Sequence, residues 1–316
     1  MNNFWKKLNK PIYALAPMAG ITDSTFRQIC KSFGVDVVYS EMASVTALTY
    51  SPEKTLKMLE FSEIERPYVV QFFGNNPKHF SKAVKIIEKE INPDGIDINF
   101  GCPAKKVAKQ GAGAELMKDL KLSKNIIQSV IDNTNIPVSI KTRTKVGDVD
   151  VLRFLDYIQD LNLKAIMIHG RTLSQGFSGK IDTEIIKKAR NYFNGIILAN
   201  GGINNYNDAL KIINESGADG VGIARGALGN PWIFSEIKEN KNKIKNYKNI
   251  FKIIIQHAKM AEKLKGKQGI IEMRKHLCWY VHSFPKASKI RQELVKIENV
   301  SDIIKIFDLH SLDNNF

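Results

Sequence analysis

Two features of the 316-residue sequence predict an α/β fold, namely a (β/α)8 TIM barrel followed by a small all-α helical domain. Eight short apolar runs alternate with longer amphipathic stretches over the first 225 residues, as is typical of a parallel sheet covered by helices. The strand pattern then stops near residue 230. A doubly wound open sheet is the structural alternative, but eight βα units fit a closed barrel better.

The barrel elements can be placed in order along the chain. Strands are expected at 12–16, 35–40, 68–72, 95–99, 138–142, 165–169, 196–200 and 220–224. Helices are expected at 24–33, 77–91, 123–134, 151–161, 182–192 and 205–215, and several begin at a Ser, Asn or Asp suited to the N-cap position. The second βα unit, at 43–59, has the least regular pattern.

The last quarter of the chain has a helical pattern only. Three helices are expected at 250–264, 270–280 and 287–295, and the lysine-rich stretch 238–249 is the expected linker. We therefore expect a catalytic barrel over residues 1–237 and a separate helical domain over residues 238–316.

The chain is strongly basic, with 47 Lys and Arg against 32 Asp and Glu and a formal charge of +15. Residues 236–316 hold 17 of the basic and 9 of the acidic side chains, so about half of the excess lies in the last quarter. Such an excess favours a polyanionic partner such as nucleic acid or a membrane surface. A lysine-rich solvated helical surface would explain the charge equally well.

Composition excludes several classes of protein. A 43% hydrophobic content is that of a globular chain with a sizeable core, which argues against disorder. The first ten residues lack the apolar run of a signal peptide, and no apolar stretch approaches the roughly 18 residues that span a bilayer. We expect a cytoplasmic protein. Cys30, Cys102 and Cys278 lie far apart, which argues against a disulfide framework or a zinc ribbon, and no metal site is expected.

Polar side chains stand at the end of nearly every expected strand. Because the βα loops of such a barrel converge at the carboxyl ends of its strands, this enrichment predicts a ligand site there. The first strand is followed by Pro17 and Met18, and the polar residues at the other strand ends are Ser40 and Glu41, Gln71, Asn99 and Cys102, Lys141 and Arg143, His169 and Arg171, Asn200, and Arg225.

The last two units favour an anion site. Gly201 and Gly202 allow close backbone approach and Gly226 precedes a short helix, so backbone N–H groups and Arg225 could hold a phosphate, although glycines are also common in ordinary turns. Lys141 at the end of a strand needs a partner if it is buried, and an anionic cofactor atom is a natural one.

The residues by themselves leave two roles open. His169 could contact the same ligand or be a histidine satisfied at a strand end, with the latter slightly favoured. Cys102, in NFGCPAKK, could be a packing residue or a reactive thiol, because free cysteine is among the most buried residue types.

A set of motifs resembles the tRNA-dihydrouridine synthase family, with order and spacing most similar to the bacterial B type. The motifs are APMAGITDSTFR, QFFG, DINFGCPAKKV with GAGAELMKD, SIKTRTKVG, HGRTLSQGFSGKID, ANGGI and GIARGALGNPWIF, and MRKHLCWY extends the resemblance into the helical domain. The resemblance implies an FMN-binding barrel and a helical tRNA-binding domain, which together reduce the C5=C6 bond of specific uridines in tRNA with NADPH as electron donor.

The resemblance also implies roles for individual residues. Cys102 would be the catalytic proton donor to C5 of the uracil, opposite a flavin that delivers hydride to C6. FMN would be bound by Pro17, Met18, Ala19, Gln71, Lys141, His169, Asn200, Gly201, Gly202, Ala224 and Arg225, and the substrate by Asn99, Lys105, Arg143 and Arg171. The sequence departs from the family pattern at Gly202, where relatives often have aspartate, and at Ala224, where many have glycine.

Recognition of tRNA implies further contacts. The target base would be flipped from its stack, and basic side chains would hold the backbone mainly through phosphates. The candidates are Lys105, Lys106, Lys109, Arg274, Lys275, Lys286, Lys289 and Arg291. We expect no membrane attachment and a monomeric protein.

Two competing functions remain at this stage. An FMN barrel acting on a small molecule, such as a dihydroorotate or enoate reductase, explains the barrel but leaves the basic helical domain without a role. A noncatalytic RNA-binding protein on a barrel scaffold would lack flavin and therefore colour.

Overall fold

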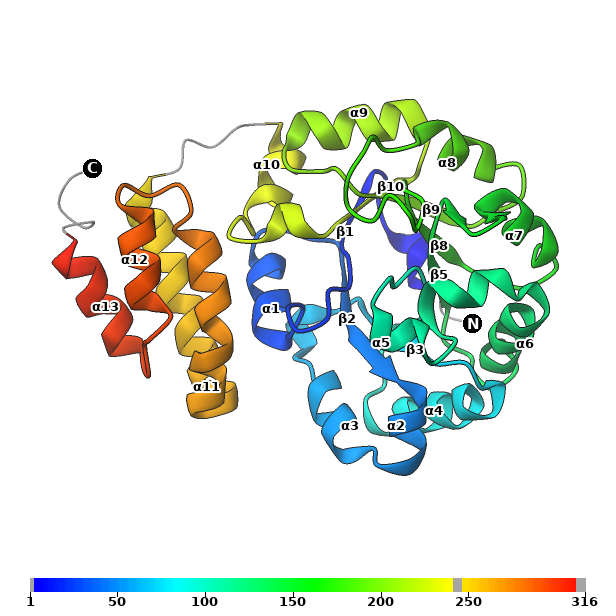
Figure 1. The fold of residues 1–316 in the computed structure, drawn as a ribbon, viewed down its shortest axis with the longest axis horizontal. Coiled ribbons are helices and arrows are strands. Elements are labelled where there is room, and N and C mark those ends of the chain that lie inside the picture. Colours follow the sequence, from blue (N-terminus) through cyan, green and yellow to red (C-terminus); the bar gives the residue numbers. More distant parts are fainter. Residues whose placement is uncertain (1–2, 241–245, 311–316) are drawn as a thin grey trace. The chain divides into compact units, whose positions relative to one another are not determined.

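Eight parallel strands close into a barrel in the order β1-β10-β9-β8-β5-β4-β3-β2, which confirms the predicted fold class (Figure 1). The computed structural model describes residues 3–240 and 246–310. The chain divides into two units, Met1–Ala224 and Arg225–Phe316. The first unit is the barrel. The expected functional boundary at residue 237 stays a prediction.

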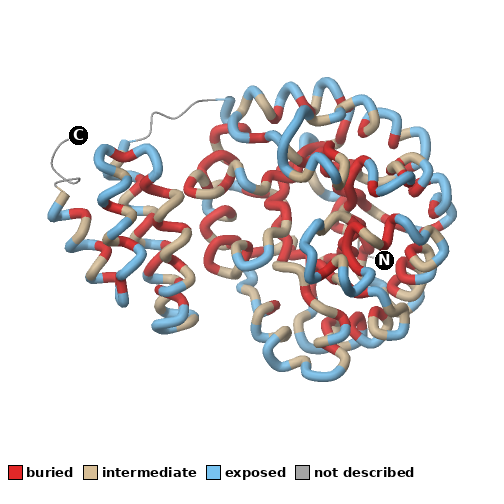
Figure 2. The backbone as a smooth tube through the Cα atoms, in the orientation of Figure 1, coloured by how far each residue is buried: buried red, intermediate tan, exposed pale blue. Residues whose placement is uncertain are grey.

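All eight expected strands form. They are β1 (Ile12–Leu15), β2 (Val37–Ser44), β3 (Tyr68–Phe73), β4 (Gly95–Phe100), β5 (Val138–Arg143), β8 (Ala165–His169), β9 (Ile196–Asn200) and β10 (Gly220–Ile223). β2 continues past its expected end because a register irregularity between Tyr39 and Met42 lets it stay paired with β3. Buried residues, red in Figure 2, concentrate on these central strands.

The expected barrel helices also form, with shifted ends. They are α1 (Ser24–Ser32), α4 (Pro77–Glu90), α6 (Leu120–Ile131), α7 (Val151–Tyr157), α8 (Thr183–Ala189) and α9 (Tyr206–Ser216). Asp23, Asn76, Asp119 and Asp182 cap four of them by accepting a hydrogen bond from a backbone N–H group in the first turn. The irregular unit 43–59 forms two short helices, α2 (Val45–Tyr50) and α3 (Glu53–Leu59), separated at Ser51 and Pro52.

Several short elements lack the periodicity by which longer ones are recognised, and of these the sequence indicated only a short helix near Gly226. They are η1 (Phe4–Lys7), η2 (Glu63–Glu65), α5 (Lys105–Ala108), η3 (Gly113–Lys118), the antiparallel hairpin of β6 (Lys145–Val146) and β7 (Val149–Asp150), and η4 (Arg225–Ala227). η1 contributes Phe4 and Trp5 to a core cluster with inward-facing residues such as Ile12, Val69 and Met167. This cluster fills the barrel interior beneath the strand ends that carry the polar side chains.

The second unit is helical, as expected, but has more helices than predicted. It contains α10 (Ile233–Glu239), α11 (Tyr247–Tyr280), α12 (Ala287–Leu294) and α13 (Val300–Leu309). Gly266, at φ 56° and ψ −140°, interrupts α11 and separates the two helices expected at 250–264 and 270–280. Part of the expected linker 238–249 falls in α10 and α11, and its residues 241–245 lie outside the described residues.

No helix among the described residues is both long and apolar enough to cross a membrane.

Candidate active site

Strand register brings the predicted polar residues together inside the barrel. Gln71 pairs with Asp97 and Asp97 with Ser139, which makes one row across β3, β4 and β5. Two residues further along the strands, Asn99 pairs with Lys141. Two residues beyond that, Arg143 pairs with His169, and His169 pairs with Asn200. Because side chains two residues apart share a face, these rows form successive layers of the barrel interior.

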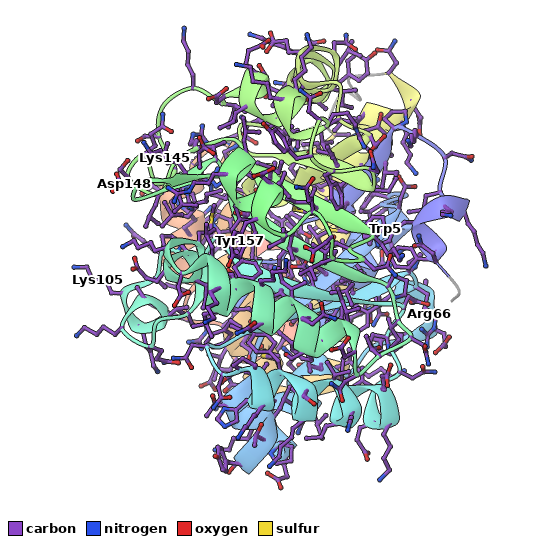
Figure 3. The ribbon with its side chains drawn as sticks, turned by 90° about the vertical axis from the view of Figure 1, so that its right-hand side faces the viewer. Trp5, Arg66, Lys105, Lys145, Asp148 and Tyr157 are labelled. Carbon is purple, nitrogen blue, oxygen red and sulfur yellow. The ribbon has the colours of Figure 1, made fainter. Side chains whose placement is uncertain are left out.

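The two ends of the barrel differ in character. Figure 3 views the barrel from the side, with Lys105 and Lys145 at one edge and Trp5 and Arg66 at the opposite edge. Lys105 follows β4 and Lys145 follows β5, so the first edge is the carboxyl end of the strands. Both lysines are exposed. The predicted site therefore opens on a face that carries basic side chains.

A buried chain of hydrogen bonds leads from the barrel interior to the loop of Cys102. Ser139 Oγ donates to Asp97 Oδ1 at 2.6 Å, and Gln71 Nε2 donates to Asp97 Oδ2 at 2.7 Å. Asn99 Nδ2 donates to Gln71 Oε1 at 2.8 Å. The backbone N–H of Cys102 donates to Asn99 Oδ1 at 2.9 Å, and that of Gly101 does so at 3.0 Å. Burial raises the pKa of Asp97 to about 6, although the bonds from Ser139 and Gln71 oppose this.

Lys141 also lies in this interior. Within the described part of the chain, its Nζ makes no hydrogen bond and no ion pair. Burial, together with the positive charge of Arg143, lowers the pKa of Lys141 to about 8, while Asp97 and Cys102 act in the opposite direction. Lys141 is partly accessible to solvent. A cation in this position can bind an anionic group of a ligand.

Two arginines tie together the loops around the site. Arg143 is 2% exposed, and its Nε donates to Gly101 O at 2.8 Å. Its Nη1 donates to two carbonyl oxygens of the loop after β8, Thr172 O at 3.1 Å and Gly176 O at 2.9 Å. Arg171 Nε donates to Gly179 O at 2.9 Å, and its Nη1 lies 3.4 Å from His169 Nε2. These contacts hold the predicted substrate-binding arginines against backbone. Their contact with substrate stays a prediction.

The glycines after β9 form a tight turn. Gly201 has φ 106°, and a Cβ atom there would come within 2.6 Å of His169 Cδ2. Asn200 Nδ2 donates to Gly222 O at 2.7 Å and so links β9 to β10. The backbone at this turn can therefore approach a ligand without a side chain in between. Arg225 follows Ala224 directly in the chain and is exposed.

The loop after β1 carries Pro17, Met18 and Ala19, and a buried ion pair supports it. Met18 N donates to Thr22 Oγ1 at 3.1 Å. Arg27 Nη1 donates to Thr22 O at 2.7 Å, and Arg27 Nε lies 2.5 Å from Glu65 Oε2. Both side chains of this pair are 0% exposed. The loop can therefore keep a fixed shape beside the open end of the barrel.

Cys102 is the cysteine whose surroundings suit chemistry. It is partly exposed, and it lies close enough to Lys141 and Arg143 to influence the electrostatics of both side chains. Gly113, at φ 66°, packs against it, because a Cβ atom there would lie 3.1 Å from Cys102 Cβ. Cys30 is buried, and burial raises the pKa of its thiol. The arrangement at Cys102 places a thiol beside a half-buried cation, where it could deliver a proton to a bound molecule.

The structure adds residues that the sequence analysis missed. Asp97 and Ser139 belong to the polar chain, and Arg27 with Glu65 braces the β1–α1 loop. A signal was present for Asp97, since a carboxylate within the otherwise apolar strand GID must find partners. Arg27 lies on an amphipathic helix, where a charged residue ordinarily faces solvent, so the sequence carries no comparable signal.

Comparison with known proteins identifies relatives over nearly the whole chain. A family model described as "Dihydrouridine synthase (Dus)" matches residues 14–314. A probable tRNA-dihydrouridine synthase of Aquifex aeolicus is 32% identical over 92% of this chain and 93% of its own length. A probable tRNA-dihydrouridine synthase of Helicobacter pylori is 34% identical over 95% and 92%. The tRNA-dihydrouridine synthase B of Pasteurella multocida is 33% identical over 88% and 86%.

Solved structures share the barrel at much lower identity. An old yellow enzyme homologue from Zymomonas mobilis aligns with a TM-score of 0.53 at 12% identity, over 76% of this chain and 91% of that one. Morphinone reductase aligns with a TM-score of 0.54 at 12% identity, over 78% and 91%. At this identity the likeness shows the fold alone.

Proposed function

The chain belongs to the dihydrouridine synthase family, and from this premise we propose that it is an FMN-dependent tRNA-dihydrouridine synthase. The proposed reaction reduces the C5=C6 bond of specific uridines in tRNA, with NADPH as electron donor. The observation that carries the proposal is Lys141, a cation inside the open end of the barrel with no partner among the described residues, beside Cys102. An anionic planar cofactor above which a base can stack accounts for both.

The residues present fit FMN. The turn at Gly201 and Gly202 leaves backbone accessible, because Gly201 is partly exposed, Gly202 is exposed and neither carries a side chain. We assign Asn200, Gly201, Gly202, Ala224 and Arg225 to the phosphate, with His169 beside them. Pro17, Met18 and Ala19 would pack against the ring, and Gln71 and Lys141 would meet its polar edge. When bound, FMN supplies the hydride that the uracil ring accepts at C6.

The side chains of this protein would supply the remaining chemistry. The Lys141 side chain would stabilise negative charge on the cofactor, because with a pKa of about 8 it is mostly cationic at neutral pH. Cys102 would donate its thiol proton to C5 of the base as a general acid. Asn99, Lys105, Arg143 and Arg171 would position the uridine nucleotide. A base inside folded tRNA must first be flipped out of its stack, and a site at an open barrel end can receive it.

We assign catalysis to residues 1–237 and tRNA binding to residues 238–316, which hold 17 basic and 8 acidic side chains. Electrostatic contacts with phosphates would give affinity, and the exposed Lys105 and Lys145 of the barrel would add to them. The protein would act in the cytoplasm as a monomer.

The experiment combines the purified protein, FMN, NADPH and an unmodified tRNA transcript, followed by mass spectrometry of the nucleosides. We expect dihydrouridine to form and to require all the components. Cys102→Ala should still bind FMN and accept electrons from NADPH, yet form dihydrouridine about 10² to 10⁴ times more slowly. Cys278→Ala is the matched control and should keep wild-type activity.

Two results would contradict the proposal. Normal turnover by Cys102→Ala would remove the proton-donor role of Cys102. Oxidation of the reduced protein by a small unsaturated substrate, with none by tRNA, would favour the alternative of a small-molecule reductase.

A further inference from the structure

We propose that Asp97 is a positioning residue that acts through Gln71 and Asn99 to fix the loop presenting Cys102. The chain of bonds is continuous, from Asp97 Oδ2 through the Gln71 and Asn99 amides to the backbone N–H of Cys102. Asp97 is too deep to be a contact residue, because it is 0% exposed and two residues before Asn99 on β4. The inference rests on the proposed function only for the role of Cys102.

The polarity of this chain is determined at both ends. An ionised carboxylate only accepts hydrogen bonds, so Gln71 must turn its Nε2 toward Asp97 and its Oε1 toward Asn99. Asn99 must then present Nδ2 to Gln71 and Oδ1 to the loop. The backbone N–H groups of Gly101 and Cys102 can only donate, so the Asn99 side chain must turn its oxygen toward them. Each amide therefore has a single arrangement that satisfies all its neighbours.

Burial makes this arrangement costly to break. Gln71 is 1% exposed, Asn99 7% and Ser139 1%, so water cannot readily replace a lost partner. Ser139 differs from Gln71 because it has a second acceptor, Ile96 O, at 3.3 Å. Its hydroxyl can turn to that carbonyl when Asp97 changes, whereas the described structure gives Gln71 Nε2 only Asp97 as acceptor. A change at Asp97 should thus pass to Gln71 and onward to the loop.

The test measures backbone amide hydrogen exchange in the peptide that contains Gly101 and Cys102, without tRNA, NADPH or FMN. Asp97→Leu removes the acceptor at similar size, and these two amides should exchange about tenfold faster than in the wild type. Asp97→Asn keeps an acceptor for Gln71 without the charge, so it should restore near wild-type exchange. Amides of β1 and β9 should not change in either variant.

A double variant distinguishes the loss of the Asp97–Gln71 bond from general destabilisation of the barrel. Asp97→Leu combined with Gln71→Met removes both partners of one bond and leaves neither unsatisfied. Because Asp97 acts through Gln71, this double variant should match Gln71→Met alone in the exchange of Gly101 and Cys102. Alkylation of Cys30, which is 0% exposed, reports global unfolding in every variant.

Three outcomes would overturn the proposal. The first is unchanged exchange at Gly101 and Cys102 in Asp97→Leu. The second is equal acceleration in Asp97→Asn and Asp97→Leu, which would assign the effect to charge. The third is additive effects of the Asp97 and Gln71 changes. A protein that passes this test but makes no dihydrouridine would refute the proposed function alone, since exchange requires no substrate.

Discussion

Lys141 shows at the scale of a residue how a binding site costs stability. Its side chain would prefer water, and burial lowers its pKa from 10.5 to about 8. Burial also disfavours the charged form of the nearby Asp97 and raises its pKa to about 6. A protein selected for stability alone would have apolar residues at these positions. Lys141, which makes no hydrogen bond or ion pair with the described residues, therefore favours a ligand site here.

The pKa of Lys141 predicts a pH dependence of stability in the ligand-free protein. Between about pH 8 and 10.5 the unfolded chain keeps the lysine proton that the native protein has lost, so the Lys141 contribution to stability rises with pH in that window. Urea unfolding at pH 7.5 and 9.5 of the wild type and Lys141→Met measures the difference. The stability advantage of Lys141→Met should be larger at pH 7.5.

An advantage independent of pH would contradict the lowered pKa of Lys141. Binding of an anionic ligand should show the opposite trend, with affinity falling as pH rises through about 8, because the cation is then lost. Lys141→Met should bind weakly at both pH values.

Most residues of the candidate site could be proposed from the sequence because they end recognisable strands. Lys141, His169 and Asn200 each close an apolar run, and parallel strands place such ends on one face. The hydrogen bonds of Asp97 and Gln71 could not be predicted, because they depend on which residues pair across strands. That register is a property of the closed barrel.

The buried ion pair of Arg27 and Glu65 acts at the scale of elements, since it joins α1 to η2 and holds the loop after β1. Glu65 also accepts from Ser24 Oγ at 2.6 Å and from Ser62 N at 2.8 Å. Arg27 lies over the Tyr68 ring, with Cζ 4.6 Å from its centroid. Loss of one member leaves a buried charge without its partner.

Arg27→Met should therefore destabilise the barrel by about 3–5 kcal/mol in urea unfolding. Arg27→Met with Glu65→Leu should lose less than the sum of the two single changes, because no unpaired charge remains. The control is Lys118→Ala, which breaks a pair with Glu115 at the surface and should cost no more than about 1 kcal/mol. Equal effects of Arg27→Met and Lys118→Ala would contradict this role.

Helices and strands could be predicted where their hydrophobic periodicity is strong. They were missed where tertiary contacts determine the local structure. α4 and α9 have clear caps and amphipathic spacing and appear within one residue of their expected ends. The hairpin of β6 and β7 has two residues in each strand, too few for a period. α13 has apolar residues at helical spacing and is capped by Asn299, whose side chain accepts from Asp302 N, so a helix signal was present that was not used.

At the scale of the whole molecule, the formal charge of +15 predicts electrostatic binding of tRNA. Affinity measured across salt concentrations should fall steeply, and Lys105→Ala should reduce the slope of log K against log salt by about 0.7 to 0.9. The control is Lys89→Ala, whose side chain is 84% exposed at the end of α4. It should leave the slope unchanged. Affinity that does not depend on salt would contradict tRNA binding through phosphates.

The most direct test of the central claim expresses this protein in a host deleted for its own dihydrouridine synthases and maps dihydrouridine in the host's tRNA. We predict that defined uridines become reduced with the wild-type chain and with Cys278→Ala, and remain uridine with Cys102→Ala. Well-expressed, flavin-loaded wild-type protein that leaves every tRNA uridine unreduced would contradict the account.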